Sequence, residues 1–568
     1  MAPEVATGPV WSPAGPPEAV ARRRLAAPVV AGTTYALAQA VLLFWWAARY
    51  PGLFSPDSLD HVWQATTGDW NTHHPISYTA LVWLSIHLTG GVGALTLAQT
   101  CALAAGLAYA VTGLRRLGGP TWGWLAAALT VVVLPPVGTF VVCVWKDVPF
   151  VICHVFLLGT LARLVARRRD GPLFSRPLFW AALVELTLIC LFRQNGFLVV
   201  AIVAALVAPL VRGAAVRILL AGVAAASVAL LTNWLLLPTL GVRDSDSIVA
   251  YEAFLGDLAI GYAQRPAGFP AADVGLLARV APLAHWRGSA DCHTVDPTVY
   301  HVDFDRRVAA EHRDEFLSAW RRLAGRDPGT VLRARVCRGS IAWRPTPAGG
   351  LRGNPTAWAL PVYLERDPRF DRPAIRKVAY SRPLGEPVAE LADRLAGRIS
   401  GPQWLLWRGA TWAYLAYLTV GLVAWLRRDR SLLALAALSL GNQLSVLAVN
   451  NAQAARYMAA PFVLGVLLLP LALAGRTPPG PDREGPERAG DRPGADPSGG
   501  PASSGGWSAL RVTDLTVGAG AAAAPAGPPA TGVAADPGAA NPDGSGPAVR
   551  VRPGWRSAGR RRRGRSAR

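Results

Sequence analysis

The chain has 568 residues, of which 52% are hydrophobic and only 16% are charged. Several apolar runs exceed the roughly 18 residues that predict a membrane-spanning helix, which excludes an ordinary water-soluble protein. The formal net charge of +21 would suggest nucleic-acid binding in a soluble chain, but much of the excess lies in short loops between apolar runs and at the C-terminal end. Membrane topology explains such loops better. A lipid bilayer is therefore a predicted partner, and nucleic acid is not.

The N-terminal part of the chain predicts a membrane anchor followed by a polar outer loop. Residues 1–25 are expected to stay in the cytoplasm, because Arg22–Arg24 precede the first apolar run. This run, 26–48, is too long for the core of a cleavable signal and should remain as a span. It delivers loop 49–75 to the outer face. Segment 76–89 is short and interrupted by polar residues, so we expect a helix lying at the membrane interface.

The remaining apolar runs alternate across the membrane when each short arginine-rich loop is placed in the cytoplasm. A transmembrane core, 26–240, and the C-terminal spans, 404–475, then hold about ten helices, with both termini inside. The chain is thus predicted to be an all-α, multi-pass protein of the cell membrane. The predicted spans are 26–48, 92–113, 120–142, 149–166, 177–192, 196–211, 216–238, 404–426, 430–448 and 458–474.

Two long polar regions lie outside these spans. Residues 241–403 are too long for a simple connection and predict an extracytoplasmic α or α/β insert domain. Cys292 and Cys337 lie in this insert and could form a disulfide if it is outside the cytoplasm, although the sequence alone does not bring them together. Residues 476–568 lack apolar periodicity and predict a disordered, basic cytoplasmic tail.

The outer loop 49–75 places acids and imidazoles beside the bilayer, where they are costly unless they have partners or a substrate. Asp57 and His74 are candidate catalytic residues, and His73 is a candidate substrate contact. Asp57 could instead cap the short helix that follows, and the histidines could simply begin a polar helix. A divalent metal is possible with these ligand types, but no tight ligand spacing requires one, so neither a metal site nor another cofactor is predicted.

A second polar cluster, at Lys146 and Asp147, follows the third predicted span. The chain has only one other lysine, Lys377, so a lysine at a membrane boundary is notable. Lys146 is a compact cation that suits a lipid-linked phosphate. The alternative is a Lys–Asp pair at the end of a helix, with its charges directed to water. We predict that both residues contact substrate.

Two further outer turns carry positive charge where it is disfavoured. Arg193 and Asn195 lie in a very short turn between two spans, and Arg456 and Tyr457 open the last span. Arg193 could bind a phosphate with two hydrogen bonds, or it could pair with an acid such as Asp147. Asn195 also suits an ordinary turn. We predict substrate contacts for Arg193, Asn195, Arg456 and Tyr457.

With these residues in view, the chain resembles the GT-C superfamily of polytopic glycosyltransferases, and especially actinobacterial membrane proteins with the pattern PDS…HHP…WKD…RQNG. The resemblance covers roughly residues 26–238 and, more loosely, the last spans. In such enzymes a carboxylate of the first external loop acts near the reaction centre, which matches Asp57. A basic residue of the second external loop contacts the lipid phosphate, which matches Lys146. Several of these families carry a second acid after the first, whereas Ser58 follows Asp57 here.

The resemblance implies a membrane glycosyltransferase that takes a hexosyl or pentosyl group from a polyprenyl-phosphate donor on the outer face. The acceptor would be an envelope glycan, lipid or protein. Asp57 would be the base, and Lys146 and Arg193 would clamp the phosphate. His74 and Arg456 would support them.

Two other functions remain open. A non-catalytic envelope scaffold would bind a partner through the insert, 241–403. A transporter or lipid flippase would need polar residues within its spans near the midplane. The candidates for such residues are Glu185, Asn233, Asn442 and Gln443.

Overall fold

The chain is helical throughout the part that its computed structural model describes, which comprises residues 26–168, 175–245, 247–346, 364, 369–398 and 403–475. No β-strand occurs in these ranges, so the predicted all-α architecture is confirmed and an α/β insert is not seen there. All described residues belong to one compact unit. The predicted N-terminal segment 1–25 and tail 476–568 lie outside the described residues.

Six helical segments in the described ranges are long and apolar enough to cross a membrane. A seventh arises if α5 (Thr121–Val133) and α6 (Pro135–Val141), which are bent by 66°, form one span. The bend has a local cause, because Leu134 precedes a proline and adopts an extended conformation (ψ 123°). The six segments are Ala27–Ala48 (α1), Gly93–Leu117 (with α4, Gly93–Leu114), Asp147–Arg167 (α7), Arg212–Thr239 (with α10, Ala215–Leu231), Gly409–Leu426 (α24) and Ala455–Leu473 (with α26, Ala459–Leu468).

The other predicted spans are helical but short. α8 (Arg176–Phe192), α9 (Gly196–Leu210) and α25 (Ala437–Val449) have 17, 15 and 13 residues. The hydrocarbon core of a bilayer calls for about 20 residues. The total of ten spans therefore stays a prediction. α3 (Ile76–Thr89) coincides with the segment for which we expect an interfacial helix.

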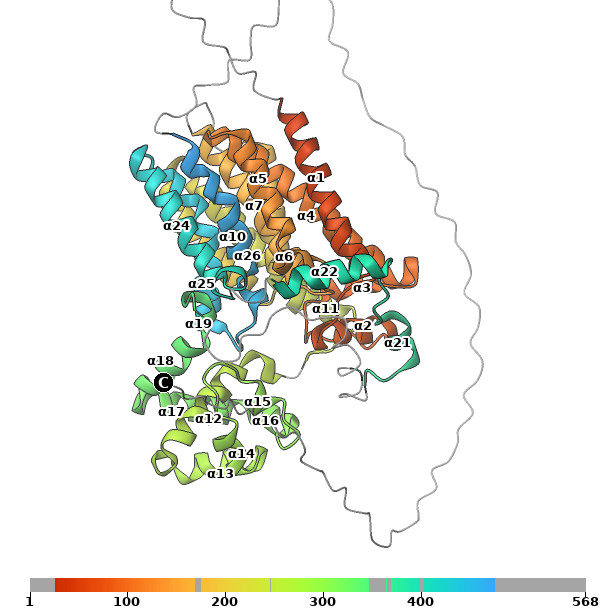
Figure 1. Ribbon diagram of the computed structural model, residues 1–568. Coiled ribbons are helices and arrows are strands. Elements are labelled where there is room, and N and C mark those ends of the chain that lie inside the picture. The colour runs from red at the N-terminus through yellow and green to blue at the C-terminus, as the bar shows by residue number, and fades with distance from the viewer. Residues whose placement is uncertain are drawn as a thin grey trace, which may run out of the picture. The chain divides into compact units, whose positions relative to one another are not determined.

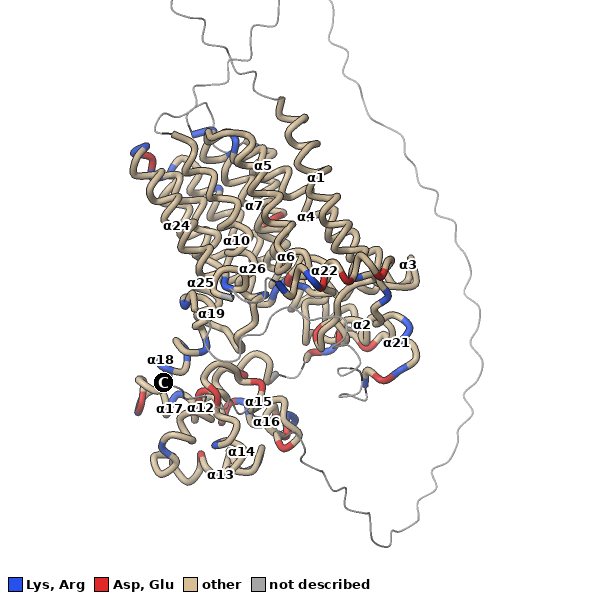
Figure 2. Tube along the Cα trace, viewed as in Figure 1, with Lys and Arg blue, Asp and Glu red and all other residues tan. Residues whose placement is uncertain are grey.

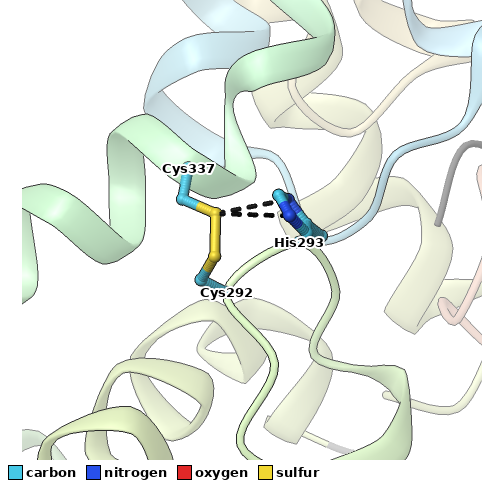
Figure 3. Close-up of side chains that lie close together, drawn as sticks. All are labelled: Cys292, His293 and Cys337. Carbon is cyan, nitrogen blue, oxygen red and sulfur yellow. Dashed lines mark hydrogen bonds between the residues drawn. A yellow bond between two sulfur atoms is a disulfide. The ribbon is translucent and has the colours of Figure 1, made fainter. Parts of the chain in front are cut away.

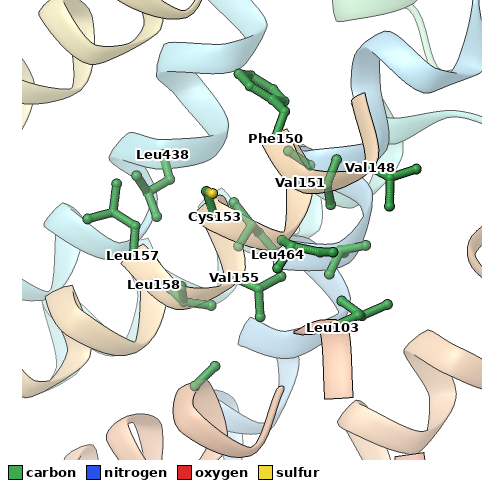
Figure 4. Packing of buried hydrophobic residues seen from close by; sticks show 14 of the residues in the cluster. Leu103, Val148, Phe150, Val151, Cys153, Val155, Leu157, Leu158, Leu438 and Leu464 are labelled. Carbon is green, nitrogen blue, oxygen red and sulfur yellow. The ribbon is translucent and has the colours of Figure 1, made fainter. Parts of the chain in front are cut away.

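Helix α7 is the centre of the bundle, and Figure 1 shows it among the other long helices. It packs against α4, α8 and α26. Of its apolar window 83% is buried inside the protein, against 22% for α1, so α1 is the peripheral helix. Figure 4 shows Val155 of α7 beside Leu464 of α26, and Leu157 of α7 beside Leu438 of α25, all in one buried cluster. Their burial positions the two ends of α7, one of which carries Asp147.

Three of the arginine-rich turns meet at one end of this bundle. The Arg427 Nη1 atom donates a hydrogen bond to the carbonyl of Leu117 at 2.6 Å, and Arg168 pairs with Asp429 at 2.7 Å. A 21-residue helix is about 30 Å long. Asp147 at the other end of α7 is therefore remote from this basic end. Figure 2 shows charged residues gathered at one end of the bundle, near the tops of α24 and α5, and again at its other end, beside α3.

The first part of the predicted insert has a hydrophobic core of its own, in which Leu255, Trp286 and Phe316 are buried. The disulfide Cys292–Cys337, with Cα atoms 5.7 Å apart, closes this region. The sequence left this bond open. The helices are α12 (Glu252–Gln264), α13 (Ala271–Val280), α14 (Leu283–Gly288), α15 (Asp296–Val299), α16 (Arg306–Glu311), α17 (Arg313–Arg326), α18 (Pro328–Arg338) and α19 (Ser340–Trp343).

The later part of the predicted insert packs on the bundle instead. α21 (Pro373–Val378) contacts α2 (Pro56–Thr67), and α22 (Glu386–Arg398) contacts α1. An ion pair of 2.5 Å joins Arg49, just after α1, to Asp393 of α22. The predicted single domain 241–403 thus contains two segments with different packing partners.

Helices α24 and α26 approach closely because a glycine lies at their contact, as is common between membrane helices. A Cβ atom on Gly465 of α26 would lie 2.4 Å from the carbonyl oxygen of Trp412 in α24, so the backbone would have to move. A Cβ atom on Gly421 of α24 would have no atom within 4 Å.

We expect Gly465→Ala to lower the thermal stability of the detergent-solubilised protein, by about 1–3 kcal/mol, because overpacking displaces backbone. Gly421→Ala is the matched control, and its added methyl group should leave stability unchanged or slightly higher. Equal melting temperatures for the two variants would contradict this packing.

Candidate functional site

All nine predicted site residues line one cavity of about 2290 Å³. Its walls come from the end of the bundle that carries Asp147 and from helices α12, α17 and α18. The residues were chosen from four stretches of sequence that are far apart, so their convergence is a property of the tertiary structure. They are Asp57, His73, His74, Lys146, Asp147, Arg193, Asn195, Arg456 and Tyr457.

The loop 49–75 is held against the turn that precedes α7. The amide of Leu53 donates a hydrogen bond to the carbonyl of Val142, and the amide of Val144 donates to the carbonyl of Leu53, both at 3.0 Å. The Trp145 indole donates a hydrogen bond to the Ser55 hydroxyl at 2.5 Å. Asp57 and Lys146, 89 residues apart in sequence, are thereby brought together.

Ser55, and not Asp57, caps helix α2. The Ser55 hydroxyl accepts a hydrogen bond from the Ser58 amide at 3.4 Å, and the Ser55 amide donates to the Ser58 hydroxyl at 3.0 Å. This reciprocal pair is a capping box. The capping role that the sequence left open for Asp57 is therefore filled, and the Asp57 carboxylate faces the cavity from the first turn of α2.

Two cations hold the Asp57 carboxylate. Its Oδ2 atom lies 3.1 Å from Arg456 Nη1 and 3.4 Å from Lys146 Nζ, and its side chain is 23% exposed. Burial alone would raise the pKa of Asp57, but the charges of Arg456 and Lys146 outweigh that effect and hold this pKa well below its usual value. Asp57 is thus ionised at neutral pH.

His74 is a neutral acceptor for Lys146. The distance from Lys146 Nζ to His74 Nδ1 is 2.7 Å. Burial, and then the charge of Lys146, hold the pKa of His74 well below its usual value. Because the ammonium can only donate, Nδ1 must be the acceptor and Nε2 carries the proton, directed at Asp60 Oδ2 at 3.9 Å. Lys146 therefore contacts Asp57 and His74. It does not form the ion pair with Asp147 that the sequence left open as an alternative.

Asp147 pairs with the two arginines of the site. Its carboxylate lies 3.4 Å from Arg193 and 3.9 Å from Arg456, and its side chain is 1% exposed. Neither carboxylate oxygen has a hydrogen-bond partner among the described residues. Arg193 also lies 4.9 Å from the centre of the Tyr457 ring. The ion pair that we left open for Arg193 therefore exists, and Arg193 and Arg456 share one buried acid.

Two predicted site residues have structural partners. The Asn195 amide group donates to the Ser445 hydroxyl at 2.9 Å, which attaches the start of α9 to α25. The backbone carbonyl of His73 accepts a hydrogen bond from Gln194 at 3.2 Å. Burial lowers the pKa of the His73 ring, although the charge of Asp60 opposes this. Asn195 and His73 line the cavity, but they lie outside the ion network around Asp57.

Sequence reasoning missed a further buried acid in the cavity wall. Glu252, at the start of α12, accepts hydrogen bonds from the Tyr300 hydroxyl at 2.7 Å and from the Asn451 amide group at 3.1 Å. Burial raises the pKa of Glu252 to about 7, against the hydrogen bond from Tyr300 and the charge of Arg306. The sequence pattern that could have identified Glu252 is an acid at the start of an apolar helix in the insert.

One flank of the cavity is apolar and belongs to helices that could border lipid. Trp234, which follows α10, is 76% exposed, and only 33% of the apolar window of this span is buried. The cavity thus joins a charged centre to an apolar opening. The apolar lining on this side includes Leu191, Phe197, Leu198, Leu230, Trp234 and Leu237.

Two groups of potential metal ligands occur among the described residues, and both lie in the insert. In the first, Cys292 and Cys337 are already joined, and His293 Nδ1 lies 3.2 Å from Cys337 Sγ (Figure 3). A disulfide has no thiolate to offer a metal, so this group does not fit one. The second group, His285, His301 and Asp303, contains no cysteine.

No protein-family model, curated protein or solved structure matches the chain. The geometry of the cavity and the chemistry of its side chains are therefore the basis for assigning a function.

Glu252 generates a pH-dependent prediction. The folded protein keeps the Glu252 proton up to about pH 7, whereas the unfolded chain loses it near 4.5. The contribution of Glu252 to the free energy of unfolding is therefore fully present below pH 4.5. It is lost as the pH rises to about 7, by an amount on the order of 3 kcal/mol. We expect the melting temperature of Glu252→Gln to change less with pH than that of wild type between pH 4.5 and about 7.

The control for this measurement is Glu315→Gln. Glu315 is half exposed, and its hydrogen bond with His312 lowers its pKa, so it should not titrate between pH 4.5 and 7. A constant difference in melting temperature between wild type and Glu252→Gln across this range would refute the buried, protonated state of Glu252.

Proposed function

We propose that the chain is a membrane glycosyltransferase of GT-C type, which moves a sugar from a polyprenyl-phosphate donor to an envelope glycan, lipid or protein. The observation that carries the proposal is the position of Asp57 between Lys146 and Arg456 in a cavity with an apolar flank. No nucleotide is required, because the protein would bind the donor through its lipid phosphate, which is also the leaving group.

Glycosyl transfer from a lipid phosphate needs three elements. A carboxylate takes a proton from the acceptor, cations stabilise the departing phosphate, and an apolar surface admits the lipid tail. In this cavity Asp57 supplies the carboxylate, Lys146 and Arg456 supply the positive charge, and the side chains beside Trp234 supply the apolar surface.

The low pKa of Asp57 makes it a weak base while both cations face it. A donor phosphate that enters would compete for Lys146 and Arg456, since its phosphodiester carries a negative charge and has two non-bridging oxygens that can accept hydrogen bonds from both cations. As the cations turn to the phosphate, the pKa of Asp57 rises and its basicity returns. Donor binding would thus activate the base, which links the two halves of the reaction.

The contacts refine the roles proposed for the arginines. Arg456 touches Asp57 directly and is the better partner for the phosphate. Arg193 lies against Asp147 and the Tyr457 ring, so it would position Arg456 through their shared acid. His74 accepts a hydrogen bond from Lys146 and would orient the ammonium group.

We place the cavity on the outer face of the cell membrane, with about ten spans and both termini in the cytoplasm. The disulfide Cys292–Cys337 supports this placement, because such bonds persist in oxidising compartments. The gathering of Arg427 and Arg168 at the remote end supports a cytoplasmic position for that end.

A transport pathway has less support. Gln443 accepts a hydrogen bond from Tyr417 and donates one to the carbonyl of Ala342. Asn442 donates to the carbonyl of Tyr457, and Glu185 accepts from Thr160. These hydrogen bonds join helices and give the three residues a structural role, although Glu185 Oε2 and Asn442 Oδ1 have no hydrogen-bond partner among the described residues.

Asp57→Asn should reduce sugar transfer by about 10²- to 10⁴-fold, the usual contribution of a positioned base. The measurement is transfer of radiolabelled sugar from polyprenyl-phosphate donors by membranes that contain the protein. The control is Asp371→Asn, since Asp371 is half exposed and pairs with Arg376 at the surface. Full activity of Asp57→Asn would remove Asp57 from this role, and transfer by neither wild type nor variant would favour the scaffold.

Lys146→Met should weaken donor binding by about 10- to 100-fold, because it removes a hydrogen bond between charged groups. The chain offers a matched control in Lys377→Met, its other lysine, which is exposed on α21 and does not line the cavity. Binding of a polyprenyl phosphate to purified protein gives the affinity. Equal affinities of the two variants would exclude Lys146 from the phosphate site.

A further inference from the structure

Two histidines and one carboxylate of the insert lie close together. His285 lies in α14, and His301 and Asp303 lie in the turn between α15 and α16. One potential ligand atom from each residue lies within 4.8 Å of the others. The His285 and His301 ring centres are 4.9 Å apart. None of these residues belongs to the ion network of the proposed transferase site.

A backbone contact selects the tautomer of the neutral His285 ring. Its Nε2 atom lies 2.9 Å from the carbonyl oxygen of Thr298. A carbonyl oxygen can only accept, so Nε2 carries the hydrogen and Nδ1 holds a lone pair in the neutral ring. Metal-binding histidines typically show this arrangement, in which one ring nitrogen donates to a backbone carbonyl and the other binds the metal.

His301 and Asp303 present two further electron-pair donors. The Asp303 amide donates to His301 Nδ1 at 3.2 Å, so this nitrogen is an acceptor. The same Nδ1 atom lies 3.5 Å from Asp303 Oδ2. Two ligand atoms on a tetrahedral zinc ion are separated by about 3.3 Å, given bonds of about 2.0 Å. A metal between Nδ1 and Oδ2 would take the place of the Asp303 amide hydrogen on the Nδ1 lone pair.

We propose that His285, His301 and Asp303 form a binding site for a divalent transition metal of the zinc class. Two nitrogen ligands and one carboxylate exclude a magnesium or calcium preference, since those ions take oxygen ligands. Three protein ligands leave a fourth position for water. The His301 and Asp303 side chains are half exposed, so they can close around an ion without displacing the core. This inference does not depend on the glycosyltransferase proposal.

A metal at this site would hold the cavity wall at His301 against the core of the insert. Tyr300 and His301 line that cavity, whereas His285 belongs to α14, whose neighbour Trp286 is buried in the core of the insert. A metal that joins His301 to His285 would attach the cavity edge to this core. The bound ion is therefore expected to stabilise the turn that carries Tyr300, the partner of Glu252.

The test is zinc binding by the full-length protein in detergent, under oxidising conditions that keep the Cys292–Cys337 disulfide closed. A chromophoric chelator competes for Zn²⁺, and wild type is compared with His301→Ala and Asp303→Asn. Loss of a ligand should weaken binding at this site by about tenfold or more, a change at least as large as that from loss of an outer-shell partner. Both substitutions are at half-exposed positions, so folding should be preserved.

His312→Ala is the control. His312 lies in the same region and contacts an acid, Glu315, but Arg279 Nη1 is 3.4 Å from its other ring nitrogen, which disfavours a metal. We expect this variant to bind zinc like wild type, and the other two to lose one equivalent. Equal zinc stoichiometry and affinity in all four proteins would overturn the proposal, as would an equal loss in His312→Ala.

A second readout uses Co²⁺ in place of zinc. Cobalt in a four-coordinate site of nitrogen and oxygen ligands gives visible absorption bands that are stronger than those of the hydrated ion. Wild type should show these bands, and His301→Ala should lose them with an unchanged melting curve in the absence of metal. Identical cobalt spectra for the two proteins would also overturn the site.

Discussion

The buried carboxylate of Asp147 is the constraint on which the rest of the candidate site depends. Its side chain is 1% exposed and lies in the first turn of α7, where the helix N-terminus favours negative charge. A buried charge without a partner costs several kcal/mol. Arg193 and Arg456 compensate this charge, so both guanidinium groups are held beside the start of the most buried helix of the bundle. Arg456 then reaches Asp57 at the start of α2.

The result is a chain of alternating charges through the cavity. It runs from Lys146 through Asp57, Arg456 and Asp147 to Arg193, with each member in contact with the next. An anion that enters the cavity must compete with a carboxylate for its cations. The proposed clamp for a phosphate and the proposed activation of the base are therefore two consequences of the same contacts.

The two parts of the insert contribute differently to the cavity. Its first part has a separate core and a disulfide, and it supplies Glu252 and Tyr300 to the cavity wall. Its later part, with α21 and α22, packs against α1 and α2 and so braces the loop that carries Asp57. The cavity is enclosed by both parts, although only the first resembles an independent domain.

The amino-acid sequence by itself determined the helices and the types of residue in the site. Apolar length is a local property, so the all-helical fold and the long apolar helices could be predicted, whereas the single span predicted over 120–142 is two helices bent by 66°. The high cost of charge near a bilayer also singled out Asp57, Lys146 and Arg193. The tertiary structure alone decided how these groups pair. Lys146 meets Asp57 and not its sequence neighbour Asp147, and Ser55 takes the capping role that Asp57 could have filled. Pairing between side chains far apart in sequence depends on how helices pack, and no local pattern encodes it.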